Sequence, residues 1–193
     1  MPRNLSPSRL EAFSDGVIAV IITIMVLELK VPARDIANTT ALHLVLPLVL
    51  VYLLSFIQTG IYWVNHHYLI DDLDQVTHGI LWSNLALLFS LSLIPVATDW
   101  VAVRGISPFS IALYSTVCAF PGISWITLST LICRHTGKHP ASGMGQQLTS
   151  AALYLGAIPM AYVSPYIALG MICLVATFWL VPPRRIVEQT RKS

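Results

Sequence analysis

The first apolar segment of the chain is preceded by a short run of charged, aromatic and hydroxyl side chains. Arg9 and Phe13 are one helical turn apart, so the guanidinium group can lie over the aromatic ring. Asp15 follows Ser14, six residues after Arg9 and on a different helical face, so each charge requires a partner on another helix or another subunit. Interhelical hydrogen bonding is one interpretation of this run, and such contacts also suit a helix that must be held around a pore.

The uncharged part of this segment is short. Only 12 residues, Gly16 to Leu27, separate Asp15 from Glu28. They span about 18 Å as a helix, whereas the hydrocarbon core of a bilayer is about 30 Å thick. A helix that crosses here must carry both carboxylates at or near membrane depth, where charges are costly and normally face protein or water. This indicates a functional helix; the alternative is that both acids lie at the surfaces of a locally thinned bilayer.

Four side chains of the same segment share one helical face through their i, i+3, i+4 and i+7 spacing: Val20, Thr23, Ile24 and Leu27. Gly16 and Phe13 continue roughly the same stripe. Because the helix is apolar on all sides, periodicity alone leaves open whether this face contacts lipid, the protein core or a pore.

Further polar groups occur where the second apolar segment ends and the third begins. Those able to hydrogen-bond to the first helix are Trp63, Asn65, His66, His67, Trp82, Ser83 and Asn84. Adjacent histidines on a helix point about 100° apart and are poor ligands for a single metal ion, and the HExxH spacing is absent. The sequence also lacks nucleotide-binding, nucleophile and CxxC motifs. We therefore expect no enzyme activity, no cofactor and no resident metal.

The composition indicates which solvent surrounds the protein. Of the 193 residues, 55% are hydrophobic and 10% are charged, whereas soluble domains carry about 25% charged residues. With so little polar surface the chain must be partly surrounded by a lipid bilayer, and its mean hydropathy of +0.72 agrees. The net charge is only +2 and the basic residues are scattered, so nucleic-acid binding is not expected.

The apolar segments predict an all-α membrane protein. We expect residues 1–193 to form a single transmembrane domain with helices at about 8–30, 41–68, 76–101, 106–133, 145–163 and 166–183. Ser164-Pro165 divides the last apolar run, which is too long for one crossing. Six spans bring both termini to one side, and eight of the 11 basic residues fall on that side. The positive-inside rule therefore predicts cytosolic termini. We expect the protein to lie in the plasma membrane.

The polar motifs resemble those of the transmembrane protein 175 family of potassium channels. The similar residues are Arg9, Phe13, Ser14 and Asp15 in the first segment, Trp63, His66 and His67 in the second, and Asn84 and Pro95 in the third. The resemblance covers the first half of the chain well. Beyond the third segment it rests on the number and length of the spans.

The resemblance implies a homotetramer of six-helix subunits, with a pore lined by the first helix of each subunit and no carbonyl-lined filter. It implies a hydrophobic constriction at Val20 and further layers at Thr23, Ile24 and Leu27, with a hydroxyl ring at Thr23 that K⁺ meets in transit. Val20 departs from the family pattern, in which a larger aliphatic side chain is commoner. The motif residues implied to hold the pore helix are Arg9, Phe13, Ser14, Asp15, His67 and Asn84.

The function implied by this family is passive conduction of monovalent cations, K⁺ above all. Two alternatives remain open: a small secondary transporter and a membrane subunit that conducts nothing. Transporters tend to carry matching helix breaks in two halves, and the prolines of this chain lack such symmetry. Saturable flux that depends on a proton gradient would indicate a transporter, and an absence of flux would indicate the subunit.

Overall fold

The computed structural model describes residues 6–29, 38–71, 73–137 and 143–180. Within these ranges the secondary structure is helical and contains no strand, which confirms the all-α prediction. The elements are α1 (Pro7–Met25), the 3₁₀ turn η1 (Val26–Glu28), α2 (Asn38–Asp71), α3 (His78–Ser92), α4 (Ile94–Arg104), α5 (Pro108–Thr136), α6 (Met144–Val163) and α7 (Pro165–Leu180).

Several of these helices are long enough to cross a bilayer. In the described part of the chain, four stretches meet both the length and the hydropathy expected of a span: Pro7–Glu28, Asn38–Asp71, His78–Arg104 and Pro108–Thr136. The apolar helix α7 is shorter, with 16 residues. Together with α6 these elements form six rods, because α3 and α4 follow each other within one span. The protein is therefore a multi-pass membrane protein.

The third segment differs from its prediction as one unbroken helix over 76–101. The structure divides it at Leu93, where α3 ends and α4 begins. Pro95 lies in the first turn of α4 and has no N–H to donate to the preceding turn, so the regular hydrogen-bond pattern is interrupted there. The helix then continues to Arg104, and Gly105 ends it with a φ of 74°, a conformation that glycine adopts without strain.

Other helices extend beyond their apolar runs. The second spans Asn38–Asp71, and the fourth ends at Thr136. Polar side chains can continue a helix into the headgroup region, so the end of an apolar run underestimates the helix. Two predicted ends, at Lys30 and at residues 181–183, lie outside the described residues.

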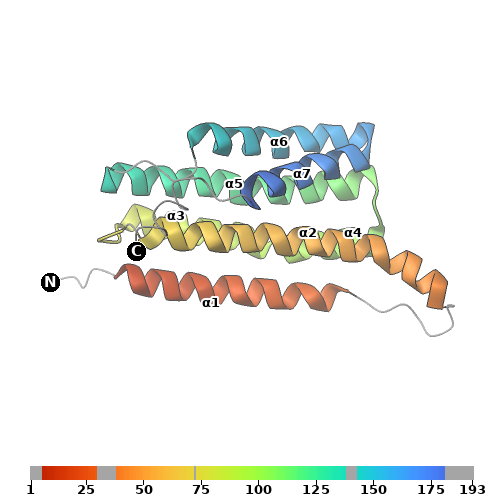
Figure 1. Ribbon diagram of the computed structural model, residues 1–193, viewed down its shortest axis with the longest axis horizontal. Coiled ribbons are helices and arrows are strands. Elements are labelled where there is room, and N and C mark those ends of the chain that lie inside the picture. Colours follow the sequence, from red (N-terminus) through yellow and green to blue (C-terminus); the bar gives the residue numbers. More distant parts are fainter. Residues whose placement is uncertain (1–5, 30–37, 72, 138–142, 181–193) are drawn as a thin grey trace.

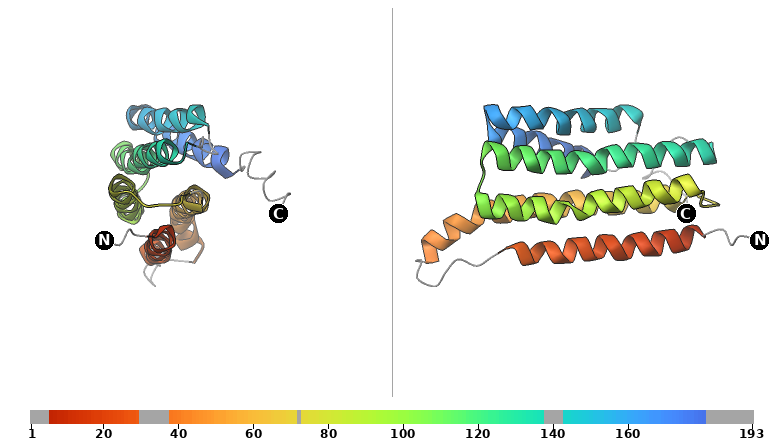
Figure 2. Two further views of the ribbon diagram at one scale, coloured as in Figure 1. Left: turned by 90° about the vertical axis from the view of Figure 1, so that its left-hand side faces the viewer. Right: turned by 180° about the vertical axis from the view of Figure 1, so that it is seen from behind.

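The helices run roughly along the long axis of the molecule, with α1 at one edge and α6 at the opposite edge (Figures 1 and 2). α1 packs against α2 and α3, and more weakly against α4, whereas α5 contacts α3, α4, α6 and α7. One side of α1 is therefore covered by its own subunit and the other side is left uncovered.

Buried hydroxyl groups join the central helices. Ser55 Oγ on α2 lies 2.8 Å from Thr98 Oγ1 on α4 and 2.8 Å from the Tyr114 hydroxyl on α5. All three side chains are almost fully buried. Because lipid supplies no hydrogen-bond partners, such contacts between helices satisfy groups that would otherwise be unpaired. They fix α2 against the α4–α5 pair.

Candidate functional site

The helix α1 has two distinct faces. Its buried face consists of Leu10, Ser14, Ile18, Ile21 and Met25, which repeat every three or four residues and meet α2 and α3. The four side chains predicted to line a pore lie on the other face of α1 and on the turn η1 that continues it: Val20 is 57% exposed, Ile24 42% and Leu27, in η1, 73%, and Thr23 is also exposed. Within one subunit nothing covers this row, which we call the exposed row of α1.

Three residues link the buried face of α1 to the neighbouring helices through one directional chain of hydrogen bonds. His66 Nε2 on α2 lies 2.7 Å from Asn84 Oδ1 on α3, and Asn84 Nδ2 donates to Ser14 Oγ at 2.9 Å. Ser14 in turn donates to the backbone oxygen of Leu10 at 2.9 Å. Because the amide oxygen of Asn84 is an acceptor, Nε2 of His66 is the donor of the first bond. The three side chains are fully buried.

Two further contacts join α1 to α2 nearer the surface. Trp63 Nε1 donates to Asp15 Oδ1 at 2.9 Å, and His67 Nδ1 lies 2.6 Å from Glu11 Oε1. Asp15 therefore finds its partner on another helix, as its distance from Arg9 along the chain indicated. Together with the buried hydrogen bonds through Asn84, these bonds join α1 to its neighbours over residues 11–15.

The remaining motif residues lie away from these contacts. Arg9 and Phe13 are exposed, and the described residues contain no cation–π contact between them. Instead, Arg104 lies over the ring of Trp100, 5.7 Å from its centroid. The guanidinium stacking expected from the spacing of Arg9 and Phe13 is therefore not seen in this structure.

Not all of the expected polar partners reach α1. Asn65 donates to the backbone oxygen of Ile61 in its own helix, and Trp82 donates to His78. Ser83 Oγ is buried and has no partner among the described residues. Of the seven candidates, four take part in the hydrogen bonds that link α1 to α2 and α3, which we call the α1 network: Trp63, His66, His67 and Asn84.

Glu11 and His66 contribute more to the α1 network than the sequence indicated. Glu11 was not predicted, although it is four residues before Asp15 and thus on a neighbouring part of the same face. His66, which bonds to Asn84, is central to the contact with α3, whereas His67 bonds to Glu11 on α1. Its spacing from Ser55, Thr59 and Tyr62 follows the helical repeat, and this signal predicts an inward-facing His66.

The geometry divides α1 into two parts. Polar contacts fix its first half against α2 and α3. Between Gly16 and Leu27, the side-chain hydrogen bond in the structure is that of Thr23 Oγ1 with the backbone oxygen of Val20, at 3.0 Å. This second half presents aliphatic side chains and one hydroxyl oxygen on an uncovered face, an arrangement suited to lining a path between identical helices.

Comparison with known proteins gives concordant results. The family described as "Endosomal/lysosomal potassium channel TMEM175" matches residues 9–95, which include α2, α3 and all of α1 except its first two residues. A protein described as a potassium channel from Chryseobacterium sp. (strain P1-3) is 40% identical over 194 residues, covering 98% of this chain and 100% of that protein. A potassium channel from Chamaesiphon minutus is 28% identical over 193 residues, covering 92% of this chain and 95% of that protein.

A solved structure is similar along nearly the whole chain. The crystal structure of a lysosomal potassium-selective channel TMEM175 homolog from Chamaesiphon minutus superposes with a TM-score of 0.73 at 26% identity. The match covers 90% of this chain and 96% of that chain. Since the motifs, the fold and a full-length relative at 40% identity agree, the chain belongs to the TMEM175 family of potassium channels.

Proposed function

We propose that the protein is a homotetrameric channel of the plasma membrane that conducts K⁺ passively through a pore lined by α1 of each subunit. The observation that carries this proposal is the exposed row of α1, in which aliphatic side chains lie uncovered on a helix held by polar contacts on its opposite face. The names of the relatives, which are described as potassium channels, support K⁺ as the permeating ion.

In this proposal, rings of Val20, Ile24 and Leu27 form a hydrophobic neck around the fourfold axis. An ion crosses such a neck only when it is wet and wide, so the pore closes by narrowing and losing its water. Valine is smaller than the aliphatic residue commoner at position 20, and its ring leaves a wider passage than isoleucine would.

Thr23 supplies the polar ring within this neck. Its hydroxyl proton points to the backbone oxygen of Val20, so the lone pairs of Oγ1 are free to face the axis. Four such oxygens would partly replace the hydration shell of a K⁺ ion that pauses there. This supports a modest preference for K⁺ over Na⁺ and requires no resident metal or cofactor.

The same proposal fixes the orientation of the chain. Because α1 and α7 run in opposite directions in the bundle, the start of α1 and the end of α7 point to one side (Figure 1). The excess of basic residues near that side favours the cytosol. Glu28 and Asp99 then lie toward the outer side, where carboxylates raise the local concentration of cations. Asp35, the third acid expected there, lies outside the described residues.

The direct test is flux through the purified full-length protein in liposomes or planar bilayers. We expect a reversal potential that follows the K⁺ gradient when K⁺ and Na⁺ are placed on opposite sides. Val20→Ala and Leu27→Ala should change the single-channel conductance. If neither substitution changes it, α1 does not form the neck.

The same preparation distinguishes the alternatives. Flux that saturates and requires a proton gradient would indicate a secondary transporter. A correctly assembled protein without flux would indicate a non-conducting membrane subunit.

A further inference from the structure

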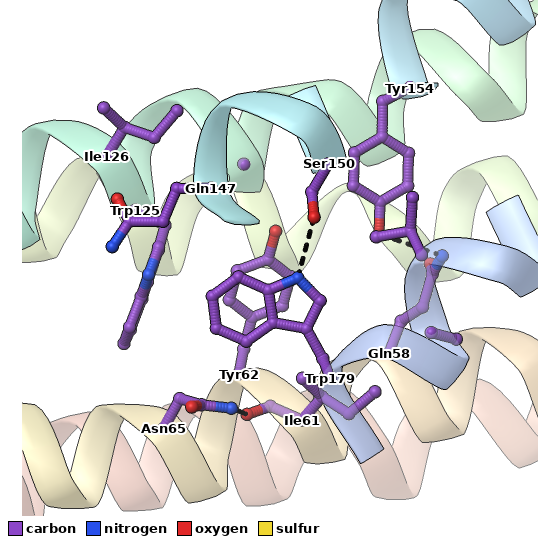
Figure 3. A pocket seen from close by; sticks show the side chains of 13 residues that line it. Gln58, Ile61, Tyr62, Asn65, Trp125, Ile126, Gln147, Ser150, Tyr154 and Trp179 are labelled. Atoms are coloured by element: carbon purple, nitrogen blue, oxygen red, sulfur yellow. Dashed lines mark hydrogen bonds between the residues drawn. The ribbon is translucent and has the colours of Figure 1, made fainter. Parts of the chain in front are cut away.

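A second candidate site lies on the side of α2 that faces away from α1. It is a partly open cavity between α2, α5, α6 and α7. Figure 3 shows four aromatic side chains around this space: Tyr62, Trp125, Tyr154 and Trp179. Concave sites with mostly apolar walls and a few polar groups are typical of small-molecule sites.

Most polar groups of the wall already have partners within the protein. Trp179 Nε1 donates to Ser150 Oγ at 2.8 Å, and Gln58 Nε2 donates to the Tyr154 hydroxyl at 3.3 Å. These bonds, drawn as dashed lines in Figure 3, hold the walls in place without involving an occupant.

Two hydrogen-bond donors of the wall differ from the others. Trp125 is only 5% exposed, and its Nε1–H has no partner among the described residues. The hydroxyl of half-buried Tyr62, across the same cavity, has no hydrogen bond to a described residue either. A buried donor without an acceptor costs about 1–3 kcal/mol, so Trp125 favours an occupant that supplies an acceptor.

The wall also restricts the charge and the shape of the occupant. None of the lining residues is acidic, basic or a histidine, so an ion would lose its hydration without gaining a counter-charge. The ring of Trp125 meets those of Tyr62 and Trp179 edge to face, with centroids 6.1 and 6.4 Å apart. A flat ring can extend such an arrangement more readily than a flexible chain.

We propose that this cavity is a binding site for a small, uncharged aromatic molecule with a carbonyl-type acceptor, which receives hydrogen bonds from Trp125 and Tyr62. The site is separate from the exposed row of α1. It lies beside the contacts that hold α1, because Tyr62 and Asn65 of its wall are sequence neighbours of Trp63 and His66. Binding does not depend on the channel function proposed above, so either proposal can fail alone.

The test uses acetophenone, an uncharged aromatic ketone, as a photolabel on the purified full-length protein. After irradiation, mass spectrometry locates the label and gives its dependence on probe concentration. We expect saturable labelling within residues 58–65, 122–126 or 175–179. Trp125→Phe keeps an aromatic ring but removes the donor, and it should raise the half-saturating concentration about fivefold, which corresponds to one hydrogen bond.

A second pair of variants tests the space itself. A Cβ atom at Gly122 would lie 3.7 Å from the Tyr154 ring and 3.8 Å from the Tyr62 hydroxyl, so Gly122→Leu directs its side chain into the cavity. The matched control is Gly170→Leu, at an exposed helical position where a Cβ atom would meet nothing within 4 Å. We expect saturable labelling to disappear in the first variant and to persist in the second.

Three results would overturn the proposal. One is labelling that does not saturate, as expected of a cavity that holds only water. Another is labelling confined to outward-facing residues. The third is an unchanged half-saturating concentration in Trp125→Phe, and this variant decides the matter alone if Gly122→Leu elutes as misfolded protein in gel filtration.

Discussion

The amide of Asn84 donates to Ser14 Oγ at 2.9 Å and thereby joins α3 to α1 at a point where both side chains are fully buried. The amide oxygen of Asn84 is bonded to His66 at the same time, so one residue links three helices. Since Ser14 and Val20 are six residues apart on α1, fixing Ser14 against α3 also fixes the direction in which the exposed row points.

Asn84→Ala should destabilise the protein by about 1–2 kcal/mol, because it leaves buried donor and acceptor groups of His66 and Ser14 unpaired. Thermal unfolding of the protein in detergent, followed by tryptophan fluorescence, measures the change. Asn65→Ala is the matched control, since the Asn65 amide bonds only to the backbone of its own helix. Equal loss of stability in both variants would contradict the linking role of Asn84.

The two adjacent histidines should respond differently to substitution. His66 is fully buried and bonded to Asn84, whereas the side chain of His67 is 56% exposed and bonded to Glu11. His66→Ala should therefore cost about 2 kcal/mol or more, and His67→Ala less than about 1 kcal/mol. The same unfolding assay measures both. A larger loss of stability for His67→Ala would show that the exposed His67–Glu11 contact, and not the buried hydrogen bonds of His66 and Asn84, holds α1.

The sequence predicted those features that depend on local spacing. Val20, Thr23, Ile24 and Leu27 share a face because of the helical repeat alone, and the structure leaves that face uncovered. The interhelical partners of Ser14 and Asp15 came from a short set of polar residues on two later segments. Charged and polar groups in an apolar segment are rare, so few pairings were available.

Features that depend on how distant segments meet could not be predicted in this way. The cavity combines residues from Gln58 to Trp179, and no local pattern shows that these residues share a space. The break at Leu93 depends on how the helix accommodates Pro95, which some helices do by bending without ending. The link between Glu11 and His67 required the relative rotation of α1 and α2.

The hydroxyl cluster at the centre of the bundle offers a second stability test. Tyr114→Phe removes the hydroxyl that lies 2.8 Å from Ser55 Oγ and keeps the buried ring. We expect a loss of about 0.5–1.5 kcal/mol in the free energy of unfolding, the range for one hydrogen bond between membrane helices. Tyr166→Phe, at a ring that is 70% exposed, is the control and should leave stability unchanged. Similar losses in the two variants would refute the role of the cluster.

Selectivity should depend on the hydroxyl of Thr23. Thr23→Val has nearly the same shape but replaces the oxygen with a methyl group, so K⁺ loses a partial substitute for its hydration shell. We expect the K⁺/Na⁺ permeability ratio to fall about two- to fivefold, equivalent to about 0.5–1 kcal/mol. Reversal potentials under bi-ionic conditions measure the ratio, and Thr23→Ser is the control that restores the hydroxyl. An unchanged ratio in Thr23→Val would exclude the hydroxyl ring as the source of selection.

The outermost ring of the proposed neck gives the sharpest test of gating by dewetting. Leu27 is the most exposed residue of the row, at 73%, and Leu27→Ser replaces its aliphatic side chain with a small polar one. Water should then remain in the neck, so we expect the open probability and the single-channel conductance to rise severalfold. Val26→Ser is the matched control, because Val26 is also exposed but lies about 120° around the 3₁₀ turn from Leu27. Currents that respond equally to both substitutions would mean that general loosening of η1, and not hydration of one face, controls the pore.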